Sequence, residues 1–587
     1  MARRLRSDTL IAAVLALLLG LVWTIRASSD LGQLRLPDTD DVMRLAQIRD
    51  WLAGQPFGDL SQHRLAGGLP MHWTRLADLG LAAIIVALRP LLGSHAAEVI
   101  AVTVWPIVLF AVALRLVIRI ARRLGGERVA ATAGVIAALA YPATTVFLPG
   151  RIDHHGLQLV LLLAGVAGLL ARDARGAALA GGCTAASLIV GLETAPLLAL
   201  AGLWLVAGWA RHRVAGATLA AFALGLLLTL IVGRALFASD DFAYPACDGL
   251  TRIAWRAFLA PAGAVLLLAL LDRLLTGHRL RWIAVVALGG GAVALGLALS
   301  PQCLHPYGAV DPRIAALWLN QVGEAQSIRS APVATSFGYA GLPLVGFAAT
   351  LWQMARRRGL ASHRGTPGDT ASGMAAETRP GWELIALLLA GALAITAVQL
   401  RGAYPAALLA APALAAMVAA ARDRGPAALV ASWLAAAGIL YPLAARALPS
   451  KTGEASVGRG DCGAPAMIAT LNRLPPGRVI APVDAGAWII GGTADTVLAA
   501  PYHRDGAGLR AVYAFYAAPA GVAAATADRL GAHYLLACAA LPGAHRRGSA
   551  AAALARGTLP GFATVAVLPD GARIIARNRL SGGAPPA

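Results

Sequence analysis

Long apolar segments recur along the chain from residue 9 to residue 446, separated by short polar stretches. Each has about 16–23 residues, which is long enough, or nearly so, to cross ~30 Å of hydrocarbon as an α-helix. The pattern predicts about thirteen transmembrane helices, and therefore a polytopic α-helical membrane protein. The expected spans are 9–26, 96–118, 129–147, 156–171, 176–192, 195–210, 214–236, 257–272, 282–300, 336–355, 382–400, 403–421 and 426–446.

The arginines between these segments indicate how the helices are oriented. Arg3, Arg4 and Arg6 precede the first span, and basic residues gather on the cytoplasmic side of membrane proteins. We therefore expect a cytoplasmic N-terminus, with every later basic cluster on that same side. The alternation requires an odd number of spans, so the apolar residues 77–92 are expected to form an interfacial helix instead of a further span.

Two polar regions lie outside this pattern. Residues 356–381 are rich in Gly, Ser, Thr, Pro and Arg, which predicts a flexible cytoplasmic loop. Residues 1–446 are expected to form the transmembrane domain, and residues 447–587 an α/β domain on the extracytoplasmic side. Its expected strands are the apolar runs 478–483, 496–500, 534–539, 563–568 and 572–577.

Composition narrows the classes of function. Of the 587 residues, 58% are hydrophobic and 14% are charged, which excludes a soluble enzyme of ordinary make-up. The net charge of +20 does not indicate nucleic-acid binding, because the arginines lie in short clusters between spans. We expect a multi-pass protein of the plasma (inner) membrane. Four of the five cysteines fall in expected outside segments, where they form either the two disulfides Cys247–Cys303 and Cys462–Cys538 or four free thiols.

Acidic side chains gather in loops expected outside the membrane. The first loop carries Asp40 and Asp41 shortly after an apolar segment, where carboxylates indicate a bound cation. The second carries Asp153, His154 and His155, which suit a divalent cation or a phosphate, although Asp153 is also a good helix cap. The catalytic loops are expected at residues 27–95, 148–155 and 301–335.

Three further polar positions are candidate site residues. Glu324 lies in the mildly apolar stretch WLNQVGEAQSI of the third loop. Arg401 follows a late span, where a guanidinium either snorkels to the interface or clamps a phosphate through parallel hydrogen bonds. His503 and Arg504, in the sequence PYHRDG, either bind an acceptor or a phosphate, or form a turn.

The order, spacing and sidedness of these motifs resemble the catalytic subunit of oligosaccharyltransferase, a glycosyltransferase of the GT-C fold. Asp40 matches an aspartate in the first external loop of that family, with Asp41 as a rival. Asp153 matches the first acid of its Asp-x-Asp or Asp-x-Glu motif, and His155 stands in place of the second acid. Glu324, in the sequence QVGE, matches the glutamate of a Thr/Ser-Val/Ile-x-Glu motif.

The resemblance implies a transfer of a sugar or oligosaccharide from a polyprenyl phosphate or diphosphate to an acceptor on the extracytoplasmic side. It implies Arg401 as a contact of the donor's phosphates, and His154, His155, His503 and Arg504 are the other expected substrate contacts. The expected catalytic residues are Asp40, Asp41, Asp153 and Glu324. The expected ligands of a divalent cation, Mg²⁺ or Mn²⁺, are Asp40, Asp153, His155 and Glu324.

The sequence leaves several classes of acceptor open. The family's external domain carries Trp-Trp-Asp, which reads the Ser or Thr of a protein acceptor, whereas residues 482–488 here read PVDAGAW. Protein, lipid and envelope glycan are all candidate acceptors. Other classes of function are a transporter of a lipid-linked or anionic substrate and a non-catalytic scaffold. Transporters more often place ionisable groups within their spans, whereas the acids here gather in loops, which favours the enzyme.

Overall fold

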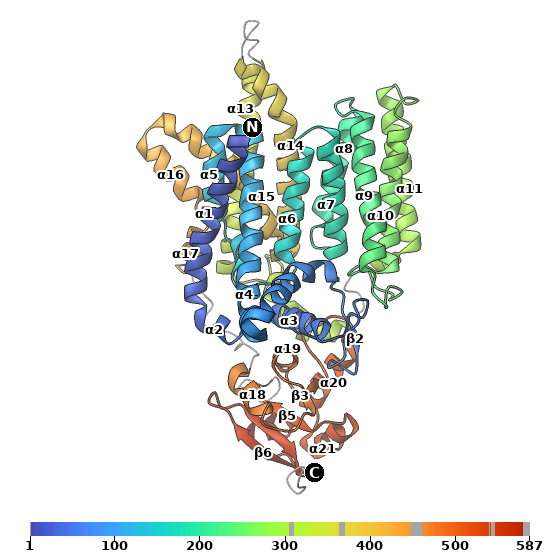
Figure 1. The fold of residues 1–587 in the computed structure, drawn as a ribbon, viewed down its shortest axis with the longest axis vertical. Coiled ribbons are helices and arrows are strands. Elements are labelled where there is room, and N and C mark those ends of the chain that lie inside the picture. Colours follow the sequence, from blue (N-terminus) through green and yellow to red (C-terminus); the bar gives the residue numbers. More distant parts are fainter. Residues whose placement is uncertain are drawn as a thin grey trace. The chain divides into compact units, whose positions relative to one another are not determined.

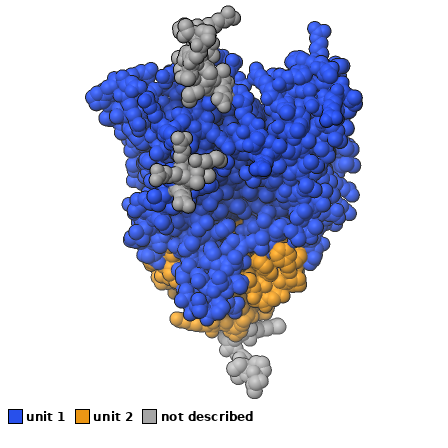
Figure 2. All heavy atoms as spheres, turned by 45° about the horizontal axis from the view of Figure 1, so that its top comes forward, with its two compact units in different colours: residues 1–28, 73–306, 322–450 blue, residues 29–72, 307–321, 451–587 orange. Residues whose placement is uncertain are grey.

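The computed structural model describes residues 2–304, 310–362, 370–447, 462–538, 541 and 546–578. The chain divides into two compact units (Figure 1, Figure 2). Unit 1 comprises residues 1–28, 73–306 and 322–450, and unit 2 comprises residues 29–72, 307–321 and 451–587. The division of function between residues 1–446 and 447–587 stays a prediction.

Unit 1 is built from apolar helices. They are α1 (Ala2–Arg26), α4 (Arg75–Gly125), α5 (Glu127–Ala138), α6 (His155–Leu169), α7 (Ala174–Val190), α8 (Ala195–Ala210), α9 (Gly216–Phe237), α10 (Arg252–Leu270), α11 (His278–Leu299), α13 (Val333–Ser362), α14 (Thr370–Val398), α15 (Ala403–Ala421), α16 (Pro426–Ala436) and α17 (Leu440–Ala445). Among the described residues, eight helices are long and apolar enough to cross a membrane, and four further apolar helices are shorter. The chain is therefore a polytopic α-helical membrane protein, while the count of thirteen spans stays a prediction.

Short elements connect these helices and the strands of unit 2. They are α2 (Ser28–Gly32), β1 (Ser61–Gln62), β2 (Leu69–Pro70), η1 (Ala143–Phe147), η2 (Pro301–Leu304), α12 (Pro312–Leu317), η3 (Leu319–Gln321), η4 (Gly323–Ala325), η5 (Leu400–Gly402) and η6 (Arg422–Arg424).

Two of the expected spans are interrupted. Residues 129–147 are helical only to the end of α5 and then form η1, since Pro142 disfavours helical backbone at the residue before it. Residues 426–446 are divided between α16 and α17. The two interruptions meet, because a Cβ at Gly438 would lie 2.6 Å from the carbonyl oxygen of Leu139. A glycine is needed at this close approach of two chains.

Helix geometry also departs from the expectation in two other places. α4 is broken at Gly93, whose φ of 79° and ψ of 167° are not helical. The break separates residues 77–92, expected as an interfacial helix, from the expected second span; the interfacial position stays a prediction. The predicted loop at 356–381 is wrong at both ends, because α13 continues to Ser362 and α14 begins at Thr370. Residues 363–369 of that prediction lie outside the described residues.

The helices α6 to α11 pack mainly against near neighbours (Figure 1): α6 on α7, α7 on α9, α9 on α10, and α10 on α11. The closest approach is between α7 and α9. A Cβ at Gly181 would lie 2.0 Å from the carbonyl oxygen of Phe222, and a Cβ at Gly225 would lie 2.2 Å from that of Ala178. Small residues allow such backbone contact between membrane helices, where dispersion forces replace a hydrophobic driving force.

Unit 2 contains a five-stranded sheet in the order β4-β3-β5-β7-β6. β3 is parallel to β4 and β5, and β7 is antiparallel to β5 and β6. Parallel neighbours need crossover connections, which helices provide here. The strands coincide with the five predicted runs: β3 (Arg478–Ile480), β4 (Thr496–Val497), β5 (Tyr534–Ala537), β6 (Phe562–Val567) and β7 (Arg573–Arg577). The helices are α18 (Ala464–Leu471), α19 (Val483–Gly492), α20 (Gly506–Ala517), α21 (Ala520–Arg529) and α22 (Ala550–Arg556).

The helix of the first loop, α3 (Thr39–Leu52), belongs to unit 2 and packs on α19. The Arg49 guanidinium donates a hydrogen bond of 2.6 Å to the carbonyl oxygen of Gly491. A Cβ at Gly491 would lie 2.3 Å from Cγ1 of Val42. The helix that carries Asp40 and Asp41 is therefore held by the same body as the C-terminal sheet.

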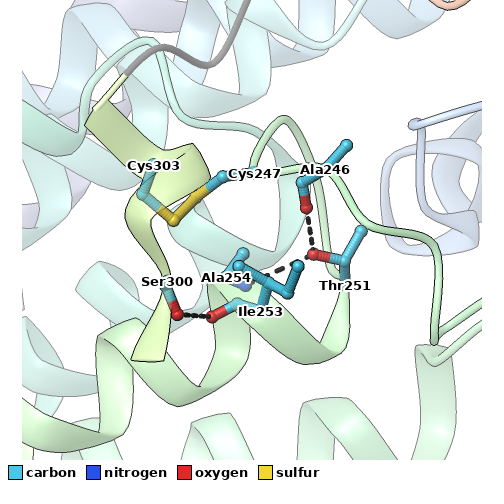
Figure 3. Close-up of a disulfide and its surroundings, with 7 residues drawn as sticks. All are labelled: Ala246, Cys247, Thr251, Ile253, Ala254, Ser300 and Cys303. Carbon is cyan, nitrogen blue, oxygen red and sulfur yellow. Dashed lines mark hydrogen bonds between the residues drawn. A yellow bond between two sulfur atoms is a disulfide. The ribbon is translucent and has the colours of Figure 1, made fainter. Parts of the chain in front are cut away.

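Two disulfides are present. Cys247 pairs with Cys303 across a Cα–Cα distance of 4.9 Å, which joins the loop before α10 to the turn after α11 (Figure 3). Near this bond, the Ser300 hydroxyl donates to the carbonyl oxygen of Ile253 at 2.9 Å. Cys462 pairs with Cys538 in unit 2 across 5.1 Å. Cys183 is a buried free thiol in α7.

Candidate active site

Four interhelical segments of unit 1 meet at one end of its helices. Asp153 and His154 directly precede α6, and Glu193 lies in the short turn between α7 and α8. Glu324 lies in η4, and Arg401 lies in η5 between α14 and α15. The last two segments are joined by a hydrogen bond of 2.9 Å from the N–H of Leu400 to the carbonyl oxygen of Gln326.

The centre of this cluster is His155, at the first residue of α6. Its Nε2 lies 3.3 Å from Oδ2 of Asp153 and 3.4 Å from Oε1 of Glu324. The hydroxyl of Tyr404, on α15, donates to the other oxygen of Glu324 at 3.0 Å. The structure thus brings Glu324 to Asp153 and His155, which lie about 170 residues earlier in the sequence.

His154 connects this centre to a residue that the sequence analysis did not single out. Its Nδ1 lies 2.6 Å from Oδ1 of Asp153, and its Nε2 lies 2.9 Å from Oε1 of Glu193. The amide of Gln158 donates to the second oxygen of Glu193 at 2.8 Å. A signal was present in the sequence: an acid in a very short turn between two apolar helices, on the side where the other acids gather.

Two glycines make room for this arrangement. Gly150 has a φ of 88° and donates its N–H to the carbonyl oxygen of Val102 at 2.8 Å, which turns the chain before Asp153. Gly191 has an extended backbone, so its role is space. A Cβ there would lie 2.6 Å from Oε2 of Glu193 and 2.9 Å from Nε2 of Gln158.

Arg401 adds positive potential to the cluster. Burial opposes the ionisation of Glu324, but His155 and Arg401 outweigh burial and lower its pKa to about 2. Burial likewise opposes the ionisation of Glu193, and the two histidines with Arg401 hold the pKa of that carboxyl well below its ordinary value. The Arg401 Nε donates to Oε1 of Gln399 at 2.9 Å, which orients the guanidinium. Both glutamates are therefore anionic at neutral pH.

The cluster can hold a metal ion. One ligand atom from each of Asp153, His154 and His155 lies within 4.8 Å of the others. Both ring nitrogens of His154 already face carboxylates, so its geometry fits an orienting role. Oδ2 of Asp153, Nε2 of His155 and Oε1 of Glu324 remain as the donor set. Carboxylate oxygens with one imidazole suit Mg²⁺ or Mn²⁺.

The other predicted site residues belong to unit 2. Asp38 caps α3, because its Oδ1 accepts a hydrogen bond of 3.2 Å from the N–H of Asp40, and Asp41 in the first turn is fully buried. His503 and Arg504 lie in the turn before α20, and Arg504 donates to the carbonyl oxygen of Pro70 at 3.1 Å. The predicted roles of Asp40 and Asp41 in catalysis or metal binding stay predictions. The same holds for the predicted roles of His503 and Arg504 in substrate binding.

Solved structures of oligosaccharyltransferase from Archaeoglobus fulgidus resemble the chain. AglB in complex with an inhibitory peptide and a dolichol-phosphate is 14% identical, with 91% of this chain and 69% of that chain covered and a TM-score of 0.62. An Archaeoglobus fulgidus oligosaccharyltransferase tethered with an acceptor peptide containing the NVT sequon is 14% identical, with coverage of 91% and 68% and a TM-score of 0.61. Its complex with Zn and sulfate is 14% identical, with coverage of 90% and 67% and a TM-score of 0.57.

No protein-family model matches the sequence, and no curated protein matches it significantly. At 14% identity, the likeness concerns the fold. The polytopic membrane architecture with a C-terminal sheet-containing domain, predicted from the sequence, is confirmed. The chain therefore has the GT-C-type fold of oligosaccharyltransferase, as the order of its motifs predicted.

Proposed function

We propose that this protein is a membrane glycosyltransferase that transfers a sugar or oligosaccharide from a polyprenyl phosphate or diphosphate to an acceptor on the extracytoplasmic side. One observation carries the proposal. His155 contacts both Asp153, from its own segment, and Glu324, from a segment distant in the sequence, at one end of the helices. A non-catalytic scaffold would have no need of such a costly set of buried charges, and a transporter more often places its ionisable groups within its spans.

The choice of a lipid-linked donor rests on chemistry and on the fold. Carboxylates around a cation, with Arg401 beside them, suit a leaving phosphate. The AglB complex that resembles this chain contains a dolichol-phosphate, and the tethered structure contains an acceptor peptide. We infer a polyprenyl-linked donor here by analogy, in the plane of the same bilayer.

A divalent cation, Mg²⁺ or Mn²⁺, would neutralise charge on the leaving phosphate. Asp153, His155 and Glu324 would hold it, and Asp40, with Asp41 as its alternative, is the predicted further ligand. His154 holds Asp153 in one orientation through its hydrogen bond to Oδ1. Arg401 would bind the donor's phosphate through its N–H groups, because a guanidinium matches phosphate geometry.

Glu324 is proposed to have a second role at the acceptor. One of its oxygens faces His155, and the other accepts from Tyr404. An anionic carboxylate held in this way can accept a hydrogen bond from the incoming nucleophile or take its proton. No covalent intermediate with the enzyme is needed, because the nucleophile can attack the sugar directly while the phosphate leaves.

The acceptor remains protein, lipid or glycan in this proposal. The stretch PVDAGAW leads into α19, in which Asp484 and Trp488 lie. It has no Trp pair, so recognition of a Ser or Thr in a protein acceptor would need other residues. His503, Arg504 and the neighbouring turn are the predicted alternatives in unit 2. We place the protein in the plasma (inner) membrane, with a cytoplasmic N-terminus and the C-terminal domain outside.

The test uses the full chain in proteoliposomes with Mn²⁺ and a radiolabelled sugar on polyprenyl phosphate or polyprenyl diphosphate. A peptide with the Asn-x-Ser/Thr sequon, a lipid and an envelope glycan serve as acceptors in separate reactions. We expect label to leave the lipid fraction with at least one pair, and D153N and E324Q to abolish this release. Label that crosses sealed vesicles while still attached to its lipid would support the transporter. Failure of every donor with every acceptor would contradict the proposed function.

A further inference from the structure

Unit 1 encloses a cavity at the end of its helices opposite to the carboxylate cluster. α6 and α8 begin beside that cluster, and the cavity lies where both helices end. Its other walls are residues near the starts of α7 and α9, together with Pro380 and Glu383 from within α14. Its volume is about 280 Å³. This is near the lower limit of ligand pockets, ~300–1,000 Å³, so the cavity suits a small group more than a whole lipid or glycan.

Basic side chains dominate the polar part of the lining. Arg172, Arg211 and Arg213 are all exposed to it, together with the carboxylates of Asp173 and Glu383. Both carboxylates already have partners within the protein. Asp173 caps α7 by accepting a hydrogen bond of 2.6 Å from the N–H of Gly176.

Glu383 is shared between two guanidinium groups, at 3.5 Å from Arg213 and 3.2 Å from Arg379. With Arg379 included, four cations surround two carboxylates. The charge balance of the cavity is therefore positive, and an anion is the ligand that it would attract.

Arg211 is arranged to bind such an anion. Its guanidinium carbon lies 5.4 Å from the centroid of the Trp282 ring, which is a cation–π contact that holds the group in place. A guanidinium in a cation–π contact still donates hydrogen bonds from its edge, and the fork of its N–H groups matches the oxygens of a phosphate. About half of the Arg213 side chain (51%) is exposed.

The remaining wall is apolar and continues onto the membrane-facing surface. Leu169, Trp204, Leu205 and Val214 line the cavity. Leu203, next to Trp204 on α8, is 59% exposed. Tryptophan beside arginine is typical of the level at which lipid headgroups meet hydrocarbon. An amphipathic ligand in this cavity would contact arginine side chains through its polar headgroup and apolar side chains through its hydrocarbon part.

We propose that this cavity binds the phosphate group of an anionic membrane lipid, with the acyl chains lying along α8 and α9. The site is separate from the proposed donor site, because it lies at the other end of the same helices. It needs only that the chain lies in a bilayer and does not depend on sugar transfer. Inorganic phosphate would offer the same charge without the chains, so it is the natural comparison ligand.

The test measures lipid binding to the full-length protein in detergent, by native mass spectrometry and by thermal unfolding. Phosphatidylglycerol, phosphatidylcholine and inorganic phosphate are added separately. We expect phosphatidylglycerol to bind and to raise the unfolding temperature, with little effect of the other two. The variant R172Q/R211Q/R213Q should bind phosphatidylglycerol at least about tenfold more weakly, because each basic residue near an anionic lipid contributes to the attraction.

The matched control, R128Q/R356Q/R424Q, removes three exposed arginines that lie outside the cavity at the same end of the helices. It should retain wild-type binding within about twofold, whereas a diffuse effect of charge would weaken both triple variants equally. The single variant R211Q, expected to bind a fewfold more weakly, serves if the triple variant does not fold. Equal binding of both lipids, equal loss in both triple variants, or stabilisation by phosphate as large as by phosphatidylglycerol would overturn the lipid assignment.

Discussion

The Oε1 atom of Glu193 lies 2.9 Å from Nε2 of His154, a residue 39 positions earlier in the chain. The opposite nitrogen of the same imidazole lies 2.6 Å from Asp153. One ring therefore joins carboxylates from two interhelical turns and leaves Oδ2 of Asp153 directed toward His155. An orienting partner of this kind fixes both the tautomer of a histidine and the direction of the ligand that it contacts.

Removal of Glu193 should therefore weaken metal binding. We expect E193A to lower the affinity for Mn²⁺ about 10–100-fold, the usual effect of losing such a partner, and E193Q to lower it less. Electron paramagnetic resonance of Mn²⁺ added to the purified protein measures this without an activity assay. D423N, which removes an exposed acid after α15, is the control. Mn²⁺ titrations of E193A and wild type that coincide would exclude the orienting role.

The hydrogen bond from Tyr404 to Glu324 should matter for turnover. Y404F removes the donating hydroxyl, so one carboxylate oxygen of Glu324 loses this hydrogen bond. A hydrogen bond to a charged group contributes ~1.5–3 kcal/mol, so sugar transfer should fall by about tenfold or more. Y441F is the matched control, since the Tyr441 hydroxyl donates to the carbonyl oxygen of Ala435 at 2.8 Å, away from the cluster. Equal rates of transfer in Y404F and Y441F would contradict a role for this bond.

Asp505 should make the stability of unit 2 depend on pH. Burial raises the pKa of Asp505 to about 7, against the opposing effect of backbone N–H donors from Gly508 and Ala500. The native state thus holds a proton that the unfolded state releases near pH ~4. The stabilisation is complete below the unfolded pKa and is lost as the pH rises through the folded pKa.

We therefore expect the unfolding temperature of the wild type to fall between about pH 5 and pH 8. D505N should show a flatter profile, because asparagine keeps the cap of α20 and does not ionise. Thermal unfolding monitored by circular dichroism at several pH values provides the comparison. Parallel profiles for the two proteins would show that Asp505 is ionised in the native state across this range.

The pairing of the cysteines predicts a simple labelling pattern. Denatured, unreduced protein should take up one alkylating group, at Cys183, and reduced protein should take up five. C247S should expose Cys303 to the reagent without changing the state of Cys462. Mass spectrometry of intact protein and of peptides counts the labels. Three or more labels before reduction would contradict at least one disulfide.

Because α7 and α9 pack closely, one added methyl group between them should lower the stability of the protein considerably. In G225A, the new Cβ would lie 2.2 Å from the carbonyl oxygen of Ala178, so the helices must move apart. Overpacking typically costs ~1–3 kcal/mol, and a lower unfolding temperature is expected. At Gly202, on α8, a Cβ would meet nothing within 4 Å. G202A should be neutral or slightly stabilising, since alanine favours a helix.

Sequence reasoning succeeded where the signal was local. Five strands of unit 2 were predicted from short apolar runs, because alternation and β-branched residues are properties of neighbouring positions. The long apolar segments were recognised for the same reason. The interruptions near Leu139 and Gly438 were missed, because they arise where two distant backbones come close together.

The residues of the candidate site also fall into two groups: those that a local motif indicates, and those that only tertiary packing brings into contact. Asp153, His155 and Glu324 could be proposed from their motifs, and the structure places them in contact. Glu193 was not singled out, because an acid in a short turn between apolar helices is a weak signal that a solvated side chain also gives. Its importance depends on His154 and Gln158, which are neighbours only after α6 and α7 have packed.

The amino-acid sequence by itself determined that this is a polytopic membrane protein with a strand-containing C-terminal domain, and it indicated which acids are candidate site residues. Hydropathy and motif spacing are sums over nearby residues, so they can be read without a fold. Only the tertiary structure decided which side chains share an imidazole, which glycines admit a close approach, and where arginines from separate turns surround one cavity. Those relationships depend on distances between segments that are far apart in the chain, and helix packing alone sets such distances.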